Sequence, residues 1–456
     1  MLSLVLAAAG FGALAGGRQY LADRSFHPIR VPAATAPASD AATALAGAST
    51  APSDPASTAA EPAAPTAAGV AAALASKLTV PELGPSVSAQ VFDAVTGTPL
   101  FGHRGAALVA PASTAKLLTA AAALTAYQPS ARFSTRVVAG DTPGSVVLVG
   151  GGDPTLSAAP AALPVEYPEA GRISDLAAQV RKSLGGSPIS QLVVDNSLFS
   201  GPATAPGWAP EDSPSSYACP ISAAMVDGGR DAPGNEQRSA NPDLAAGNAL
   251  AAALGVPTVL RGTAPAGAKL LGTVRSAPVG VLVEQMLRDS DNVIAEVLTR
   301  QVAIAAHQPA SFAAGAAAVR AAIAPLGIAG GSGMRDGSGL SVLDRIPATA
   351  LSQVLLQAVR PNRPALRFIL SGLSVAGWDG SLIEQGRFGA AGGAADGVLR
   401  AKTGSLTGVS TMAGVVTDAD GRQLIFAFAA DQAPSEAGTR NAIDQLALAV
   451  ARCGCH

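Results

Sequence analysis

The pattern of apolar and polar residues predicts that regular structure begins near Leu78. Alternation over residues 87–93 predicts a strand, residues 94–97 supply a turn, and residues 99–102 predict the second strand of a β-hairpin. Residues 113–127 are apolar on almost every helical face. A helix of that kind is expected to be buried in the middle of its domain.

Strands and helices then alternate along the next part of the chain. The pattern predicts strands at 133–139, 145–149, 191–195 and near 258, with helices at 173–184 and 244–254. This order of elements is typical of an independent α/β unit.

The C-terminal part has a different order, with helices first and strands afterwards. Helices are expected at 279–306, 348–359, 366–373 and 439–451, a glycine-rich loop at 331–341, and strands at 399–405, 410–418 and 423–431. Glycine turns join the three strands, which predicts an antiparallel arrangement.

The N-terminal residues have the composition of targeting and linker segments. Residues 1–17 are almost wholly apolar, and we interpret residues 1–30 as a signal peptide or a membrane anchor. Residues 31–76 are rich in Ala, Pro and Thr and contain few large apolar side chains, which predicts a disordered linker. Such a linker suits a domain that works at a distance from a membrane.

Charge and composition exclude several classes of function. The 456 residues include 30 basic and 32 acidic side chains, so nothing indicates nucleic-acid binding. Four histidines and three cysteines give no spacing typical of a metal site, and we expect neither a metal nor a cofactor. Cys219 could form a disulfide with Cys453 or Cys455, or all three thiols could be unpaired.

The first candidate catalytic residues are Ser113 and Lys116, which lie three positions apart at the start of the predicted buried helix. On a helix this spacing places both side chains on one face. A serine hydroxyl is a poor nucleophile unless a neighbouring group takes its proton, and a lysine with a lowered pKa can do so. Taken alone, the pair is also typical of an ordinary solvated helical turn.

Two further motifs follow in a fixed order: Ser290-Asp-Asn292 and Lys402-Thr-Gly404. With Ser113-x-x-Lys116, they match the motif set of penicillin-binding proteins and serine β-lactamases. The match implies that Ser113 is the nucleophile, that Lys116 is its base, and that Ser290 relays a proton to the leaving amine.

The remaining motif residues are expected to bind the substrate. Asn292 would hold a substrate amide, while Lys402 and Thr403 would hold its carboxylate. Gly404 would let the strand backbone approach closely, and the backbone N–H groups of Ser113 and Ser405 would form an oxyanion hole.

The resemblance is more specific than these motifs alone. The long separation of Ser113 from Ser290 resembles class C low-molecular-mass penicillin-binding proteins, the D-alanyl-D-alanine carboxypeptidase/endopeptidase family of the penicillin-binding protein 4 type (peptidase family S13). Agreeing stretches are 93–97, 152–156, Asp195 with Phe199, Gly201, Pro202 and Trp208, Tyr217 with 220–223, and 336–341. Cys219 and Asp227 depart from the family's usual residues.

The resemblance implies an α+β penicillin-binding/β-lactamase-like transpeptidase fold, an antiparallel sheet flanked by helices. The catalytic domain would be discontinuous, formed by residues 77–135 and 273–456, with an α/β accessory domain at 136–272 inserted between the first and second motifs.

The activity implied is that of a penicillin-sensitive serine D-Ala-D-Ala carboxypeptidase outside the cytoplasm. Its partners would be peptidoglycan stem peptides ending in D-Ala-D-Ala, β-lactam inhibitors and, through residues 1–17, a membrane. DD-endopeptidase activity is a further expectation that the sequence leaves open. A serine β-lactamase and a non-catalytic peptidoglycan-binding protein on the same fold are the alternatives.

Four other residues receive structural interpretations. We expect Asp153 to form a turn, Trp208 and Tyr217 to anchor loops, and Asp336 to brace the rim of the active site.

Overall fold

The computed structural model describes residues 62–383, 387–388 and 393–455. These described residues form one compact unit. The predicted signal or anchor at 1–30, and the linker up to residue 61, lie outside the described residues. Within the described ranges, no helix is both long enough and apolar enough to cross a membrane.

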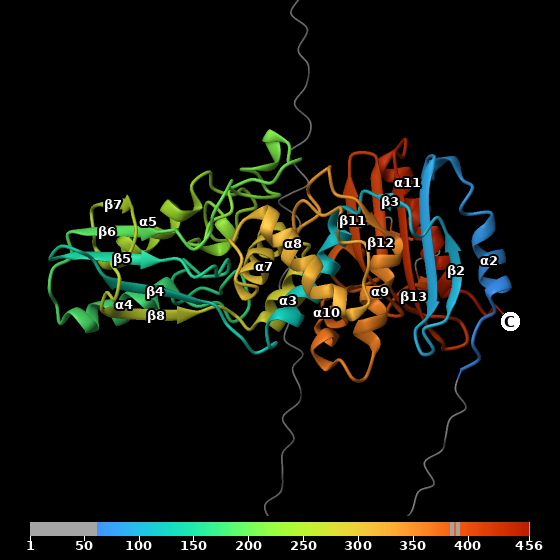
Figure 1. The fold of residues 1–456 in the computed structure, drawn as a ribbon, viewed down its shortest axis with the longest axis horizontal. Coiled ribbons are helices and arrows are strands. Elements are labelled where there is room, and N and C mark those ends of the chain that lie inside the picture. Colours follow the sequence, from blue (N-terminus) through green and yellow to red (C-terminus); the bar gives the residue numbers. More distant parts are fainter. Residues whose placement is uncertain (1–61, 384–386, 389–392, 456) are drawn as a thin grey trace, which may run out of the picture. The chain divides into compact units, whose positions relative to one another are not determined.

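The central sheet has six strands in the order β10-β11-β12-β13-β1-β2, and every neighbouring pair is antiparallel. The strands are β1 (Ser86–Asp93), β2 (Pro99–His103), β10 (Ser374–Val375), β11 (Leu399–Leu406), β12 (Val409–Thr417) and β13 (Gln423–Asp431). The predicted hairpin and the three predicted C-terminal strands are therefore all present, in one sheet (Figure 1).

Both faces of this sheet are covered. Because side chains alternate along a strand, Ala413 and Val415 of β12 enter one core while Met412 and Val416 enter the other. The first core is packed with α3 (Lys116–Ala126), α6 (Val279–Arg288), α7 (Asn292–Ala305), α8 (Phe312–Ile323), α9 (Ala348–Val359) and α10 (Arg367–Gly372). The second core contains α2 (Ala67–Ala75) and α11 (Glu436–Ala451).

Helix α3 confirms the expectation drawn from its apolar composition. Every residue from Lys116 to Leu124 is buried. A preceding 3-10 turn, Ala112–Ala115, carries Ser113, and the short strands β3 (Leu108–Val109) and β9 (Ile346–Pro347) pair beside it.

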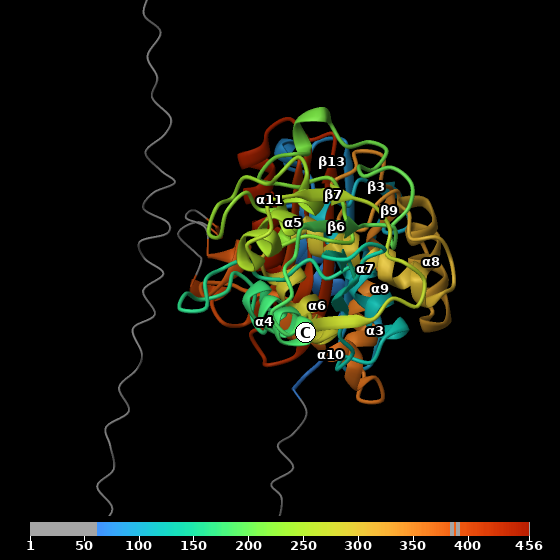
Figure 2. The ribbon, with the colours of Figure 1, turned by 90° about the vertical axis from the view of Figure 1, so that its left-hand side faces the viewer.

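A second sheet of five strands lies between the first and second motifs in the sequence. Its order is β7-β6-β5-β4-β8, with β5 (Ser145–Val149), β6 (Gln191–Asp195) and β7 (Val259–Arg261) parallel, and β4 (Ser134–Ala139) antiparallel to β5 and to β8 (Leu270–Arg275). Helices α4 (Ile173–Leu184) and α5 (Pro242–Leu254) pack on it and face the viewer in Figure 2. The predicted α+β fold with an inserted α/β region is confirmed.

Strand β8 and helix α8 were not predicted. Strand β8 contains Gly272 and has exposed side chains at both ends, so its residues show no clean alternation. Its pairing with β4, more than 130 residues earlier, makes it a strand.

The predicted linker ends earlier than expected. Residues Ala67–Ala75 form helix α2, whose first turn is capped by the Thr66 hydroxyl. Val70 and Leu74 lie four residues apart on one helical face and are both buried. The expectation of disorder up to residue 76 is therefore wrong for this last part, because alanine favours helix and two apolar side chains suffice to dock it.

Both cysteine alternatives are also wrong. Cys453 and Cys455 form a disulfide with each other, and Cys219 is buried with a free thiol. Cys219 packs instead in a small core with Ile221 and Phe312, remote in sequence from the C-terminal pair.

Candidate active site

Residues of all three motifs line a cleft of about 680 Å³ beside strand β11. Six of the predicted site residues line it: Ser113, Ser290, Asn292, Thr403, Gly404 and Ser405. The other two, Lys116 and Lys402, lie beneath its surface with side chains that are 0% and 1% exposed. The fold thus brings together all eight predicted residues.

The Ser113 hydroxyl lies directly beside the Lys116 amine. Lys116 Nζ is 2.8 Å from Ser113 Oγ, 2.6 Å from Asn292 Oδ1 and 2.8 Å from the Ser338 carbonyl oxygen. An ammonium group has three N–H donors, so these three acceptors fix its position completely. The lysine is thereby held against the hydroxyl whose proton it would accept.

Burial lowers the pKa of Lys116 to about 8, although the carboxyls of Asp336 and Glu296 oppose the shift. At this pKa about a tenth of the amine is uncharged at pH 7. Burial, followed by the charge of Lys116, also lowers the pKa of Lys402 well below its usual range. The sequence suggested burial and the second cation, Lys402, as the causes of a lowered Lys116 pKa, and desolvation by burial is the largest cause in the structure.

Glycine is required at position 404 because two backbones meet there. A Cβ on Gly404 would lie 2.8 Å from the backbone nitrogen of Ser113 and 2.9 Å from Ala112 Cβ. The Thr411 hydroxyl donates to the Pro111 carbonyl at 2.8 Å and ties the sheet to the same turn. The Ser113 N–H and the backbone of β11 therefore adjoin one another, as the donors of an oxyanion hole require.

Lys402 and Thr403 are held by local hydrogen bonds. Lys402 Nζ donates to the Thr403 carbonyl at 2.8 Å, and the hydroxyls of Thr403 and Ser381 are 2.6 Å apart. The Thr403 hydroxyl at the cleft surface, with the Lys402 amine beneath it, is suited to a carboxylate.

Ser290 forms the corner between α6 and α7 with a left-handed backbone, at a φ of 56°. A non-glycine residue in this region costs of order 1–3 kcal/mol and persists only where its surroundings hold it. The next residue, Asp291, helps to fix this backbone conformation because it caps α7. Its carboxylate accepts a hydrogen bond from the Ile294 N–H at 3.0 Å.

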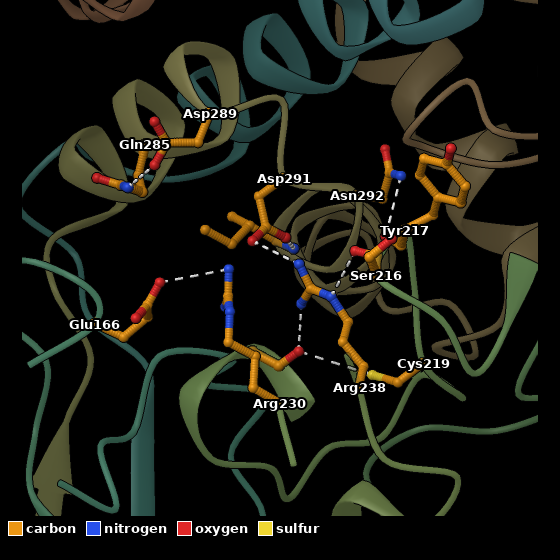
Figure 3. Close-up of polar contacts among 12 residues, drawn as sticks. Glu166, Ser216, Tyr217, Cys219, Arg230, Arg238, Gln285, Asp289, Asp291 and Asn292 are labelled. Atoms are coloured by element: carbon orange, nitrogen blue, oxygen red, sulfur yellow. Dashed lines mark hydrogen bonds and ion pairs between the residues drawn. The ribbon is translucent and has the colours of Figure 1, made fainter. Parts of the chain in front are cut away.

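Residues of the inserted region also hold the Ser290 corner in place, and Figure 3 shows the ion pair of Arg238 with Asp291 among these contacts. The Tyr167 hydroxyl donates to Asp291 Oδ2 at 2.8 Å, and the Arg238 guanidinium forms an ion pair with the same oxygen at 3.2 Å. Asn292 Nδ2 donates to the Tyr217 carbonyl at 3.1 Å. Burial alone would raise the pKa of Asp291, but the charges of Arg238 and Arg230 hold it well below its usual range.

The sequence did not identify Arg238 or Tyr167. Both lie in loops without a periodic pattern, and each meets Asp291 only through the tertiary fold. An arginine that follows the turn-rich segment 227–235 is too common to indicate such a role.

Replacing Arg238 by alanine is expected to destabilise the protein by about 3–5 kcal/mol, because it leaves the buried Asp291 carboxylate without its cation. Urea unfolding measures this change. Arg132→Ala is the matched control, since Arg132 pairs with the exposed Glu169 and this ion pair should contribute about 1 kcal/mol or less. Equal destabilisation by the two substitutions would contradict the assignment.

A cluster of carboxyls supports the loop that contacts Lys116. Glu296 accepts from the Ser338 N–H at 2.8 Å, and Asp336 accepts from the Gly339 N–H at 2.7 Å. Burial and the charge of Asp336 raise the pKa of Glu296 to about 8 and that of Asp344 to about 10. The expectation that Asp336 braces the site is confirmed, although it does so from beneath the loop.

Trp208 is the loop anchor that the sequence predicted, since its indole N–H donates to Asp336 at 2.7 Å. Asp153 is the predicted turn former and accepts from the Thr155 N–H at 2.8 Å. The interpretation of Tyr217 is wrong for its side chain, which is 60% exposed and lines the cleft, while its backbone carbonyl holds Asn292.

An antiparallel sheet flanked by helices, with a serine–lysine pair against one of its strands, defines the class of serine enzymes that includes penicillin-binding proteins and β-lactamases. The comparisons with known proteins narrow this class. The profile of the D-Ala-D-Ala carboxypeptidase 3 (S13) family matches residues 70–235 and 232–453, and the chain belongs to this family, as the resemblance implied.

Relatives and solved structures agree with this membership. A carboxypeptidase of Mycobacterium tuberculosis is 45% identical over 390 residues, and the carboxypeptidase DacB of Mycolicibacterium smegmatis is 43% identical over 390 residues; each match covers 84% of both chains. The crystal structure of penicillin-binding protein 4 from Haemophilus influenzae superposes with a TM-score of 0.70 at 23% identity, covering 84% of this chain and 99% of that one. This structural likeness shows the fold.

Proposed function

We propose that Ser113 is the acyl-accepting residue of this serine D-Ala-D-Ala carboxypeptidase and that Lys116 is its base. The observation that carries the proposal is the 2.8 Å contact between Lys116 Nζ and Ser113 Oγ, made by a fully buried lysine whose pKa burial lowers to about 8. A nucleophile and a base within hydrogen-bond reach, with the base oriented by further groups, are the requirements for acyl transfer.

In the first step, Ser113 Oγ attacks the carbonyl of the penultimate D-Ala while its proton moves to Lys116 Nζ. The backbone N–H groups of Ser113 and Ser405 stabilise the oxyanion. The peptide C–N bond breaks, and the proton taken up by Lys116 reaches the leaving D-Ala amine through the Ser290 hydroxyl, which gives one proton and receives another. Water then hydrolyses the ester and returns a proton to Ser113 Oγ. Until the D-Ala leaves, Lys402 and Thr403 hold its terminal carboxylate, and Asn292 binds the peptide amide of the stem.

The substrate is a peptidoglycan stem peptide ending in D-Ala-D-Ala, which places the reaction outside the cytoplasm. β-Lactams acylate Ser113 as well, because their strained amide and carboxylate imitate that terminus. Residues 1–17 serve as the export signal or membrane anchor.

We propose the same domain boundaries as the sequence predicts. Residues 77–135 and 273–456 form the catalytic domain, and residues 136–272 form an accessory domain. The contacts of Tyr167 and Arg238 with Asp291 support a role for the accessory domain in holding the Ser290 corner.

Product analysis on a defined pentapeptide tests the proposed reaction. Incubation with the purified chain is expected to release one D-Ala and leave a tetrapeptide, detected by mass spectrometry and chiral amino-acid analysis. A pentapeptide ending in D-Ala-L-Ala is the control and should stay intact. Absence of D-Ala release, or equal cleavage of both peptides, would overturn the proposal.

A further inference from the structure

Arg387 lines the active-site cleft and has no role in the reaction described above. Its side chain is 7% exposed, and its Nη2 forms an ion pair with Asp444 Oδ1 of helix α11 at 2.6 Å. The Phe388 N–H donates to the other oxygen of the same carboxylate at 3.1 Å. Asp444 therefore holds both the backbone and the guanidinium of this segment at the wall of the cleft.

Stability alone is a weak reason for an arginine in this position. A buried ion pair loses much of its attraction to the desolvation of its two charges. Burial raises the pKa of Asp444 even though the charge of Arg387 opposes the shift, so the pair does not fully offset the desolvation of that carboxyl. The exposure of Arg387 to the cleft indicates a use for its charge there.

The charge of Arg387 acts where the terminal carboxylate of the substrate is proposed to bind. After burial and the charge of Lys116, it is the next cause of the lowered pKa of Lys402. Thr403 and Ser381 line the same cleft, with their hydroxyls 2.6 Å apart. The guanidinium is thus near the lysine and the hydroxyl that the motif assigns to the carboxylate.

Lys402 by itself is a poor source of permanent positive charge. Its amine is buried, has a pKa well below its usual range and donates to the Thr403 carbonyl at 2.8 Å. The carboxylate of Asp289, which also lines the cleft, acts on the same amine. A guanidinium stays charged at any working pH and presents five N–H donors in a planar fork, so it can bind Asp444 and a ligand carboxylate together.

We propose that Arg387 binds the terminal carboxylate of the leaving D-Ala beside the Thr403 hydroxyl, and that it makes the site selective for peptides with a free carboxylate over those with a terminal carboxamide. The inference rests on the proposed function. Asp444 is the positioning residue that holds the guanidinium at the cleft. A carboxamide carries no negative charge, so it would not gain the charge-assisted hydrogen bonds that a carboxylate forms with arginine.

The test compares a pentapeptide that ends in D-Ala-D-Ala with the same peptide as its C-terminal carboxamide. The unaltered chain is expected to prefer the free acid. Arg387→Gln should lower kcat/KM for the free acid about 10- to 100-fold, as expected for a lost hydrogen bond between charged groups, and leave the carboxamide within about twofold. Arg387→Lys, which keeps the charge, should restore part of the preference. Acylation of Ser113 by benzylpenicillin and by its methyl ester gives the same comparison without turnover.

Two further variants keep the result independent of folding. Arg387→Gln leaves the Asp444 carboxylate buried without its cation, so the substitution is also made together with Asp444→Asn, where the new amide oxygen can still accept from the Phe388 N–H. This double variant should show the same selective loss relative to Asp444→Asn alone. Arg440→Gln is the matched control, since Arg440 also lines the cleft, and it should leave the preference for the free acid unchanged.

The outcomes separate this inference from the proposed function. An equal loss on both peptides in the double variant, an unchanged rate on the free acid, or the same loss of preference in Arg440→Gln would overturn the assignment of Arg387. Equal cleavage of both peptides by the unaltered chain would overturn it as well. Failure of the unaltered chain to release D-Ala from the free acid would instead overturn the proposed function.

Discussion

Replacing Ser113 by alanine is expected to abolish covalent labelling by radioactive or fluorescent penicillin and to lower D-Ala release by about 10⁴-fold or more. The reason is that the ester to Ser113 Oγ is the intermediate of both reactions, and no other hydroxyl contacts Lys116 Nζ among the contacts seen in the described part of the chain. Gel detection of the labelled protein and product analysis measure the two effects.

The control is Ser187→Ala, which removes an exposed serine hydroxyl in the inserted region and should leave both readouts unchanged. Equal labelling of the Ser113→Ala variant and the unaltered chain would contradict the assignment. The lifetime of the label distinguishes the β-lactamase alternative: a carboxypeptidase retains its penicilloyl ester for minutes or longer, whereas a β-lactamase hydrolyses it rapidly.

Lys116→Ala is expected to lower kcat/KM for D-Ala release by about 10²–10⁴-fold, the range typical of a lost general base. In the unaltered chain only the uncharged amine can accept the serine proton. Since burial lowers the Lys116 pKa to about 8, kcat/KM should rise with pH and level off above about 8. A flat profile between pH 6 and 9 would contradict this role.

Two carboxyls next to Lys116 provide a matched pair of variants for the same profile. The charge of Asp336 favours the charged lysine, so Asp336→Asn should lower the Lys116 pKa and move the rise in kcat/KM to lower pH. Asp344 acts on the Lys116 pKa in the same direction but less strongly than Asp336, and burial raises its own pKa to about 10, so Asp344→Asn should move the midpoint less. Equal shifts in both variants would show that the change is structural.

Elements with a local or periodic signal were predictable from the sequence. The apolar run after Ser113 predicted a helix buried on all sides, and α3 has every residue from Lys116 to Leu124 buried. The hairpin and the three C-terminal strands were equally recognisable, because alternation and glycine turns specify them within a few residues. The three motifs were readable in the same way, since each consists of a few adjacent residues.

The groups that support these motifs come from distant parts of the chain and depend on the tertiary fold. Lys116 contacts the carbonyl of Ser338, 222 residues later, and Asp291 receives the hydroxyl of Tyr167, 124 residues earlier. These partners lie in loops, where polar residues follow no period and propensity does not indicate what they touch. Their positions depend on how helices pack and sheets pair, and for that reason neither the lowered pKa of Lys116 nor the ion pair of Arg238 with Asp291 could be assigned before the fold was known.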